Sequence, residues 1–481
     1  MRRVAVGRSS HYLSWMNSEA EVGDSRLCAE CVDEPYLANL IVKHGETGSC
    51  DYCDRAGPGE TISELADRFE GMFQQHYERE GEIDYRWAEP RGESVEFIIA
   101  DTGRLPEDAA ADIQSVMEDR YFDFDAAAMG DQTEYDSELT YVESHVDVRD
   151  LQEDWSALEQ EIKTRRRFFS RSAESGFVRL FDGIHSLRTR DGRPVVRVIG
   201  PDTDIPALFR GRAFQSTARF DEALIEPERL VGSPATEHAR AGRMNSQGVS
   251  VFYGATSEAL ALAEVRPPVG SRVITGRFDL LRPLTVLDVE ALETVLVTGS
   301  LFDPNFATQL ERAAFLARLA RRIRMPVMPD DEATDYLVTQ AMADFLSDRL
   351  EPPLDGIAYG SPQSGVEGEF NVALFNPAAR VEAVAKAGGD VSVHASGGDE
   401  EIDAYMVWTE IDSAKEPPKP PAPDNLWDIR TEQSDEDLDL RHDTLRLDRD
   451  SLQVHHVRQI RVETDAVQVQ QTVWDVAKAP F

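Results

Sequence analysis

The sequence predicts an α+β protein of several domains, and three observations support this. The chain has 481 residues, which exceeds what one hydrophobic core usually holds, so we expect about two to four domains. Hydrophobic residues make up 41% of the chain, a fraction typical of globular proteins. Helical periodicity dominates from Thr61 to Arg171, whereas short β-rich runs begin after Gly192.

The net charge limits the partners that the chain can have. It carries 89 acidic and 50 basic residues, which gives a net charge of −39. Such a surface repels nucleic acid and anionic membranes, so we expect neither as a partner. No apolar run approaches the roughly 20 residues that span a bilayer, and the N-terminal extension, residues 1–24, lacks the apolar stretch of a secretion signal. The sequence therefore predicts a cytoplasmic protein.

All four cysteines lie in a predicted module at residues 25–58. Cys28, Cys31, Cys50 and Cys53 form two CxxC pairs with the spacing of zinc ribbons. Two disulfides are the alternative, but the chain has no export signal and no further cysteine. Four thiolates fill the coordination shell of zinc, so the predicted metal is structural. The segment between the pairs has no basic cluster, which argues against DNA binding by this module.

Residues 59–190 predict a helical domain. Thr61 or Ser63 can cap its first helix, in which Leu65 and Phe69 belong to one apolar stripe. Further helices are predicted at 107–118 and 151–167. An acidic, aromatic segment links these two helices, and we expect the aromatic residues to pack in the core of the domain.

Residues 191–386 predict a mixed α/β domain, because strand-like runs separated by Gly- and Pro-containing turns flank two helical segments. Strands are expected at 195–200, 272–280, 284–289, 355–361 and 369–377, and helices at 306–324 and 331–350. Residues 249–253 predict a further buried strand, followed by a helix that Thr256 or Ser257 can cap. We expect Arg243 before this strand, Tyr253 at its end and Glu264 in the helix to meet at one edge of the sheet.

The motifs of this mixed domain resemble those of the RES domain, a family named for an arginine, a glutamate and a serine. The matching segments are LFRGR at 208–212, GRMN at 242–245, VFYGATSEALALAEV at 251–265, YLVTQAMADFL at 336–346 and DGIAYGS at 355–361. With the cysteine pairs and the helical domain before it, the chain is similar over residues 25–385 to the long RES proteins that carry a HEPN/RES N-terminal domain.

This resemblance implies a fold like that of ADP-ribosyltransferases and an enzyme that consumes NAD by splitting the nicotinamide–ribose bond. RES proteins are variously NAD glycohydrolases, NAD phosphorylases or ADP-ribosyltransferases, and several act as toxins paired with an antitoxin. By motif, the catalytic residues are Arg210, Glu264 and Ser361, with Arg243 and Tyr253 at further positions that bind NAD.

Arg212 lies two positions after Arg210 in LFRGR, and the sequence leaves open which of the two arginines faces the substrate. Residues two apart on a strand share a face, but in a turn they diverge. Arg212 is therefore kept as a further NAD-binding residue.

The chemistry of NAD cleavage suits these residue types independently. A guanidinium binds an anionic pyrophosphate through paired hydrogen bonds, a role that suits Arg210 or Arg243. Cleavage places positive charge on the ribose, which a carboxylate such as Glu264 stabilises. Tyr253 can stack on the nicotinamide ring, and Ser361 can hydrogen-bond the carboxamide or the ribose. Because nicotinamide is already a cationic leaving group, the predicted reaction needs no metal.

Residues 387–481 predict a β-rich acidic extension with a Pro-rich linker, EPPKPPAPDN. A strand is expected in IDAYMVWTEI, and the runs VHHVRQIRVE and AVQVQQTVW could pair as a hairpin. His455 and His456 would face opposite ways on a strand, which argues against a shared metal ion. The extension could cover a sheet edge, pair with another subunit or dock a partner.

Two classes of function follow from these patterns. The first is an NAD-consuming enzyme in a toxin or defence setting, and the second is a catalytically inactive RES-fold scaffold that binds partners through the zinc module and the tail. The complete motif set favours the enzyme, because a scaffold does not need it. Small RES toxins are restrained by an antitoxin, so an antitoxin or an intramolecular inhibitor is an expected partner here. The sequence leaves a homo-oligomer open.

Overall fold

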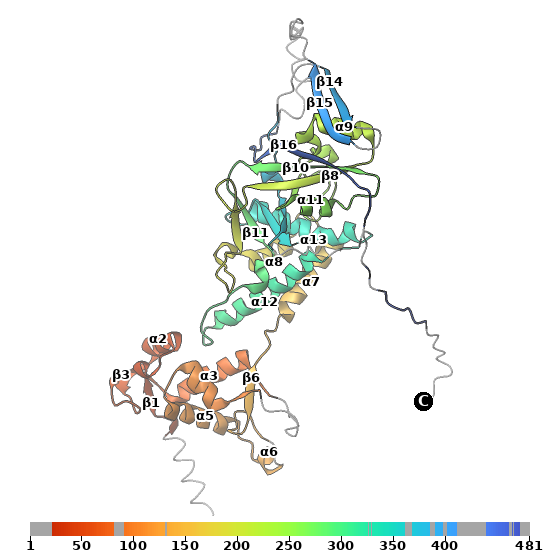
Figure 1. Cartoon of the computed structure of the whole chain (residues 1–481). Helices are drawn as coiled ribbons and strands as arrows, with labels where there is room; N and C mark the ends of the chain where they lie inside the picture. The colour runs from red at the N-terminus through yellow and green to blue at the C-terminus, as the bar shows by residue number, and fades with distance from the viewer. Residues whose placement is uncertain are drawn as a thin grey trace, which may run out of the picture. The chain divides into compact units, whose positions relative to one another are not determined.

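The computed structural model describes residues 22–80, 91–129, 132–325, 327–328, 330–360, 368–384, 390–397, 402–410, 439–460, 464 and 466–471. The chain divides into two compact units (Figure 1). The first comprises residues 1–161, 186–194 and 291–322, and the second comprises residues 162–185, 195–290 and 323–481. No helix among the described residues is long and apolar enough to cross a membrane.

The first unit begins with a small antiparallel sheet in the order β1-β3-β2. Its strands are β1 (Arg26–Cys28), β2 (Glu46–Ser49) and β3 (Ala56–Thr61), with helix α2 (Pro35–His44) between the first two in sequence. Glu34 caps α2 by accepting a hydrogen bond from the backbone N–H of Leu37. The paired cysteines stand at the ends of these short strands.

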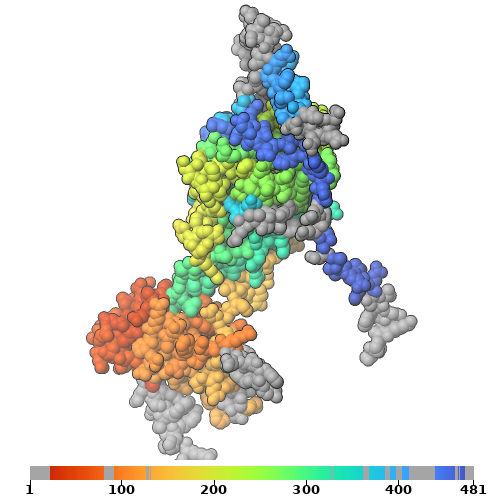
Figure 2. Space-filling model, in the orientation of Figure 1, coloured from red at the N-terminus to blue at the C-terminus, as the bar shows by residue number. Residues whose placement is uncertain are grey.

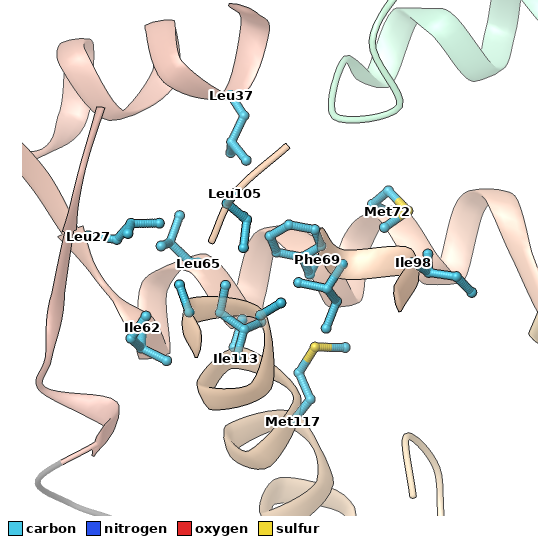
Figure 3. Packing of buried hydrophobic residues seen from close by; sticks show 14 of the residues in the cluster. Leu27, Leu37, Ile62, Leu65, Phe69, Met72, Ile98, Leu105, Ile113 and Met117 are labelled. Carbon is cyan, nitrogen blue, oxygen red and sulfur yellow. The ribbon is translucent and has the colours of Figure 1, made fainter. Parts of the chain in front are cut away.

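Helix α3 (Ile62–His76) is the centre of the hydrophobic core of this unit. Thr61, one of the two predicted caps, caps it and forms a capping box with Glu64. Its stripe of Leu65, Phe69 and Met72 is buried against α4 (Val95–Gly103) and α5 (Glu107–Tyr121), and Figure 3 shows this packing. A short helix, α6 (Phe124–Met129), follows α5.

A second three-stranded sheet, in the order β4-β6-β5, lies in the part predicted to be helical. Its strands are β4 (Tyr77–Arg79), β5 (Glu93–Ser94) and β6 (Thr140–Glu143). Strands of two to four residues are too short to show a period-2 pattern, so the sequence did not predict them. Most of α7 (Arg149–Thr164) and of α12 (Pro304–Arg324) also belongs to this unit, where the Trp155 and Phe315 rings lie 5.7 Å apart.

An eight-stranded sheet forms the second unit, in the order β16-β10-β8-β9-β13-β12-β11-β7. Each neighbouring pair is antiparallel except β11 and β12, which are parallel. The strands are β7 (Val196–Ile199), β8 (Ala207–Phe214), β9 (Phe252–Ala255), β10 (Arg272–Leu280), β11 (Leu284–Asp288), β12 (Gly356–Gly360), β13 (Phe370–Leu374) and β16 (Leu445–His456). The six strands predicted between 195 and 377 are all present, although the one expected at 249–253 begins at Phe252, and β8 was not predicted.

Helices cover both faces of this sheet (Figure 1). On one face, α9 (Thr217–Ile225) and α10 (Pro227–Leu230) bury Phe220 and Leu230 against Phe252 and Phe278. On the other face, α11 (Glu258–Val265) packs Leu260 against Phe209. The unit also contains α8 (Arg171–Phe181) and α13 (Glu332–Asp344), which a π-helical turn, Phe345–Arg349, extends. Short 3-10 turns occur at Ala29–Cys31, Ile184–Ser186, Thr236–His238, Ala291–Thr294 and Asn376–Ala378.

Part of the C-terminal extension completes the sheet. Strand β16 pairs with β10 on both sides of an irregularity between Asp448 and Gln453, and Figure 2 shows its blue residues beside the green residues of β10. His455 bonds Thr275 on one side and His456 bonds Tyr405 on the other, so the two histidines face opposite ways as predicted. Of the predicted hairpin partner AVQVQQTVW, residues 466–471 form no strand and the rest lies outside the described residues. Strands β14 (Asp390–Gly397) and β15 (Ile402–Glu410) form a separate hairpin.

Replacing Leu445 with alanine should destabilise the second unit by about 2–5 kcal/mol, because a fully buried leucine leaves a cavity when truncated. The matched control is Leu440→Ala, since Leu440 precedes the same strand and is 93% exposed. Urea unfolding of both variants measures the effect. Equal stability of the two variants would contradict the packing of β16 into the core.

Candidate active site

The predicted site residues gather where strands β8 and β9 separate. In the described strands, these two share one paired position, Phe209 with Ala255. Both side chains lie on the sheet face that α11 covers. Because side chains alternate along a strand, the Tyr253 side chain projects from this α11 face. The side chains of Arg210 and Arg212 project from the opposite face, which α9 covers.

The segment Gly242–Asn245 forms a tight turn before β9. The side-chain amide of Asn245 donates to three backbone carbonyls of the surrounding loop, at 2.8, 3.1 and 2.9 Å. Gly242 has no room for a side chain, because an added Cβ would lie 2.7 Å from both Asn245 Oδ1 and Tyr253 Oη. One of the three carbonyls belongs to Val249, so the turn holds this residue and β9 begins at Phe252 instead of at 249 as predicted.

Helix α13 fixes the same turn from the other side. The Thr339 hydroxyl donates to the carbonyl of Arg243 at 2.6 Å, and the Gln340 amide donates to the carbonyl of Gly242 at 2.8 Å. The guanidinium of Arg243 donates to the carbonyl of Met325 at 2.8 Å and lies 5.6 Å from the centre of the Tyr336 ring. Two consecutive helical residues therefore hold the backbone that presents Arg243.

The hydroxyl of Tyr253 both accepts and donates a hydrogen bond within the turn. It accepts a hydrogen bond from the backbone N–H of Met244 at 3.0 Å and donates to Asn245 Oδ1 at 2.8 Å. Burial raises the pKa of Tyr253 to about 12, although the Met244 N–H and the positive charges of Arg210 and Arg243 act in the opposite direction. The phenol is therefore neutral at physiological pH, and its ring belongs to β9.

Both arginines of LFRGR bind free carbonyls at the C-terminal end of α10. Arg210 donates through Nε to the carbonyl of Val231 at 2.8 Å and through a second nitrogen to the carbonyl of Tyr253 at 2.6 Å. Arg212 donates to the carbonyl of Leu230 at 2.7 Å. Cations are favourable at a helix C-terminus, where the last carbonyls lack partners. Burial and the repulsion of Arg212 lower the pKa of Arg210 to about 10, so it keeps its charge.

Glu264 meets two polar residues of the neighbouring strands. Asn371 of β13 is buried, and its amide donates to Glu264 Oε2 at 3.2 Å. Tyr359 of β12 pairs directly with Asn371 across the strands, so the two side chains share the α11 face. Burial raises the pKa of Tyr359, as do the nearby Glu264 carboxylate and Tyr253, whereas Arg243 lowers it.

The structure thus groups Arg243, Tyr253 and Glu264 around Tyr359 on one face of the sheet. Arg210 reaches β9 through the carbonyl of Tyr253, and Arg212 points to α10 from the other face. Ser361 lies outside the described residues.

Sequence reasoning missed Asn371 and Tyr359, the two polar residues beside Glu264. Each occupies a position in a predominantly apolar strand, EFNVALF and GIAYG, and this contrast is the signal that could have identified them. Gln340 of α13 gives a similar signal, because it is a buried polar residue in a helix.

The four cysteines form a compact cluster of free thiols in the first unit. Their sulfur atoms all lie within 4.8 Å of one another, and the separations are 3.7 Å for Cys28 and Cys31, 3.6 Å for Cys28 and Cys53, and 3.8 Å for Cys31 and Cys50. The backbone N–H of Cys28 also points at the sulfur of Cys50, at 3.4 Å. This donor set could hold a metal ion.

A pocket of about 550 Å³ lies in the first unit and contains none of the predicted site residues. Its lining includes the acidic side chains of Glu60, Glu64 and Asp67 beside the apolar side chains of Met72 and Phe302. Glu64 is engaged in the helix cap, and Glu60 forms a two-bond ion pair with Arg68. The carboxylates of this pocket therefore serve local structure.

Comparison with protein-family models gives two matches. Residues 43–176 match the HEPN/RES N-terminal domain 1, and residues 217–394 match the RES domain. The RES match includes Arg243, Tyr253 and Glu264 and begins after Arg210 and Arg212. No curated protein and no solved structure matches the chain significantly.

The two matched models identify this chain as a RES domain protein. More particularly, the chain belongs to the long type, in which a HEPN/RES N-terminal domain precedes the RES domain. RES domains are linked to enzymes that act on NAD, and both domains are associated with NAD-related toxin–antitoxin systems.

Replacing Asn245 with alanine should destabilise the second unit by about 1–3 kcal/mol, because its loss leaves the bonded carbonyls and the Tyr253 hydroxyl without their partner. Gln247→Ala is the control, since Gln247 is an exposed residue of the same loop and its loss should change stability by less than about 0.5 kcal/mol. Denaturant unfolding compares the two, and equal effects would contradict the role given to Asn245.

Proposed function

We propose that this chain is an NAD-consuming enzyme that cleaves the nicotinamide–ribose bond and transfers the ADP-ribosyl group to water, phosphate or a protein side chain. The observation that carries the proposal is the position of Glu264 inside the RES match, where Asn371 holds one carboxylate oxygen and Tyr359 stands beside it. The known link of RES domains to NAD supports it.

Local positive charge supports an anionic substrate on this acidic protein. Arg210, Arg212 and Arg243 form no ion pair with any described residue, and their guanidinium groups bind backbone carbonyls. Carbonyls use N–H donors without cancelling the positive charge. Of the three, Arg243 lies on the side of the sheet that carries Glu264, so its charge stays available to the pyrophosphate of NAD, to which its remaining N–H groups can donate. Arg243 belongs to the turn that binds the Tyr253 hydroxyl, and it is our first choice for the contact with the pyrophosphate.

The proposed chemistry needs a stabilised ribose cation and little else. When the glycosidic bond breaks, its electron pair leaves with the nicotinamide, which becomes neutral, and the positive charge moves to the ribose. The Glu264 carboxylate stabilises this charge electrostatically. A lone pair of the acceptor then forms the new bond to the ribose carbon, and the acceptor releases its proton. The ring of Tyr253, fixed by its two hydroxyl bonds, supplies an aromatic face for the nicotinamide.

Glu264→Gln should lower nicotinamide release from NAD about 100-fold or more, because the variant keeps the shape of the side chain and removes its charge. Purified full-length protein is incubated with NAD, with and without phosphate, and released nicotinamide is quantified.

Glu258→Gln is the matched control for this experiment, since Glu258 lies in the same helix and bonds Thr275 and His455 instead of the cluster. It should retain the wild-type rate. Equal release by the wild type and Glu264→Gln would remove Glu264 from catalysis. Absence of release from well-folded wild type with every acceptor would favour the scaffold function.

We further propose that the four-cysteine cluster binds one structural zinc ion. Tetrahedral zinc with bonds of about 2.3 Å to sulfur requires sulfur atoms about 3.8 Å apart, and three of the six sulfur pairs, at 3.6–3.8 Å, fit this requirement. Such an ion would join the turn after β1 to the turn after β2 and thereby supplement the small core of this region.

Cys31→Ser should therefore lose the zinc that the purified wild-type protein carries at about one ion per chain, because serine replaces a thiolate with a weak ligand. His44→Ala is the control, since His44 lies between the two cysteine pairs and outside the cluster. Metal analysis gives the zinc content, and a chelator should lower the melting temperature of the control but not of Cys31→Ser. Full zinc content in Cys31→Ser would contradict this site.

A further inference from the structure

The hydroxyl of Tyr359 is a polar group that the proposed mechanism leaves unused. It projects from β12 on the face that also carries Asn371 and Tyr253. It forms no hydrogen bond with any described residue. The Tyr359 side chain is only partly buried.

Tyr359 differs in this respect from Tyr253, its neighbour on the same face. The Tyr253 hydroxyl has one donor and one acceptor in the turn and therefore has no bond left to give to a ligand. The Tyr359 phenol retains its proton, since burial and Glu264 raise its pKa. It is thus a neutral donor that has no acceptor in the described protein.

The carboxylate of Glu264 complements this donor. Asn371 occupies Oε2, and Oε1 makes no hydrogen bond to a described residue. Asn371 also pairs directly with Tyr359, so one buried amide fixes the position of the carboxylate beside the phenol. A free acceptor and a free donor are therefore linked through Asn371 on the same face of the sheet. A vicinal diol offers the complementary pair, because one hydroxyl can donate while the other accepts.

We infer that Tyr359 contacts the substrate directly: its phenol donates to one hydroxyl of the nicotinamide ribose, while Glu264 accepts from the adjacent hydroxyl. This inference rests on the proposed NAD cleavage. It assigns the site a preference for an intact ribose diol, and it makes Asn371 a positioning residue for the carboxylate. Loss of either hydroxyl would leave one protein group without a partner.

The test compares Tyr359→Phe with the wild type on NAD and on two analogues that lack the 2′- or the 3′-hydroxyl of the nicotinamide ribose. For NAD, the variant should lower kcat/KM for nicotinamide release about tenfold, the effect of one neutral hydrogen bond. For one of the two analogues, the variant and the wild type should react at the same rate, because the hydroxyl that Tyr359 contacts is already missing.

Tyr135→Phe is the matched control, since it removes a buried phenol hydroxyl from the first unit and should leave every rate unchanged. Melting temperatures of both variants establish that they are folded. An active wild type with an unaffected Tyr359→Phe variant would overturn this inference and leave the proposed function standing. An equal loss for NAD and for both analogues would also overturn it, because the effect would then be structural. A wild type that releases no nicotinamide would overturn both proposals.

Discussion

The arrangement of the RES unit depends on the hydrogen bonds of one buried side-chain amide, that of Asn245. It donates to three loop carbonyls and accepts the hydroxyl of Tyr253, so it joins the turn to strand β9. Helix α13 then bonds the carbonyls of Gly242 and Arg243. Unpaired polar groups are costly when buried, and this closed network fixes the turn in one conformation. The position of Arg243 follows from it.

Charge is the second constraint on this protein. On a chain with a net charge of −39, many arginines have carboxylates nearby that cancel their charge. Arg210 and Arg212 instead lie against backbone carbonyls at the end of α10. In contrast, Arg229 on the same helix is bound by Glu222 and Glu226 and is neutralised. The type of partner, carbonyl or carboxylate, thus separates cations that can serve a ligand from those that serve stability.

Both units depend on segments that are remote in sequence. Strand β16 adds Leu445 and Leu447 to the core and covers the edge of β10, where unpaired backbone groups would otherwise be open to other chains. In the first unit, residues of the span 291–322 contribute Phe302, whose ring lies 5.0 Å from that of Phe69. Truncation at either place would expose apolar surface that the remaining chain has no means to cover.

The sequence by itself determined the α+β class, most strands and helices α11 and α13 of the RES unit, and the clustering of the cysteines, because periodicity, caps and spacing are local properties. Tertiary structure decided that Tyr253 is held by Asn245 and that Glu264 meets Asn371 and Tyr359, since strand order and register bring these residues together. Tertiary structure also decided that strand β16 of the C-terminal extension covers a sheet edge. The alternating sequence alone left three roles open for this extension. Which strands pair depends on residues that are far apart in the sequence, so no local pattern predicts it.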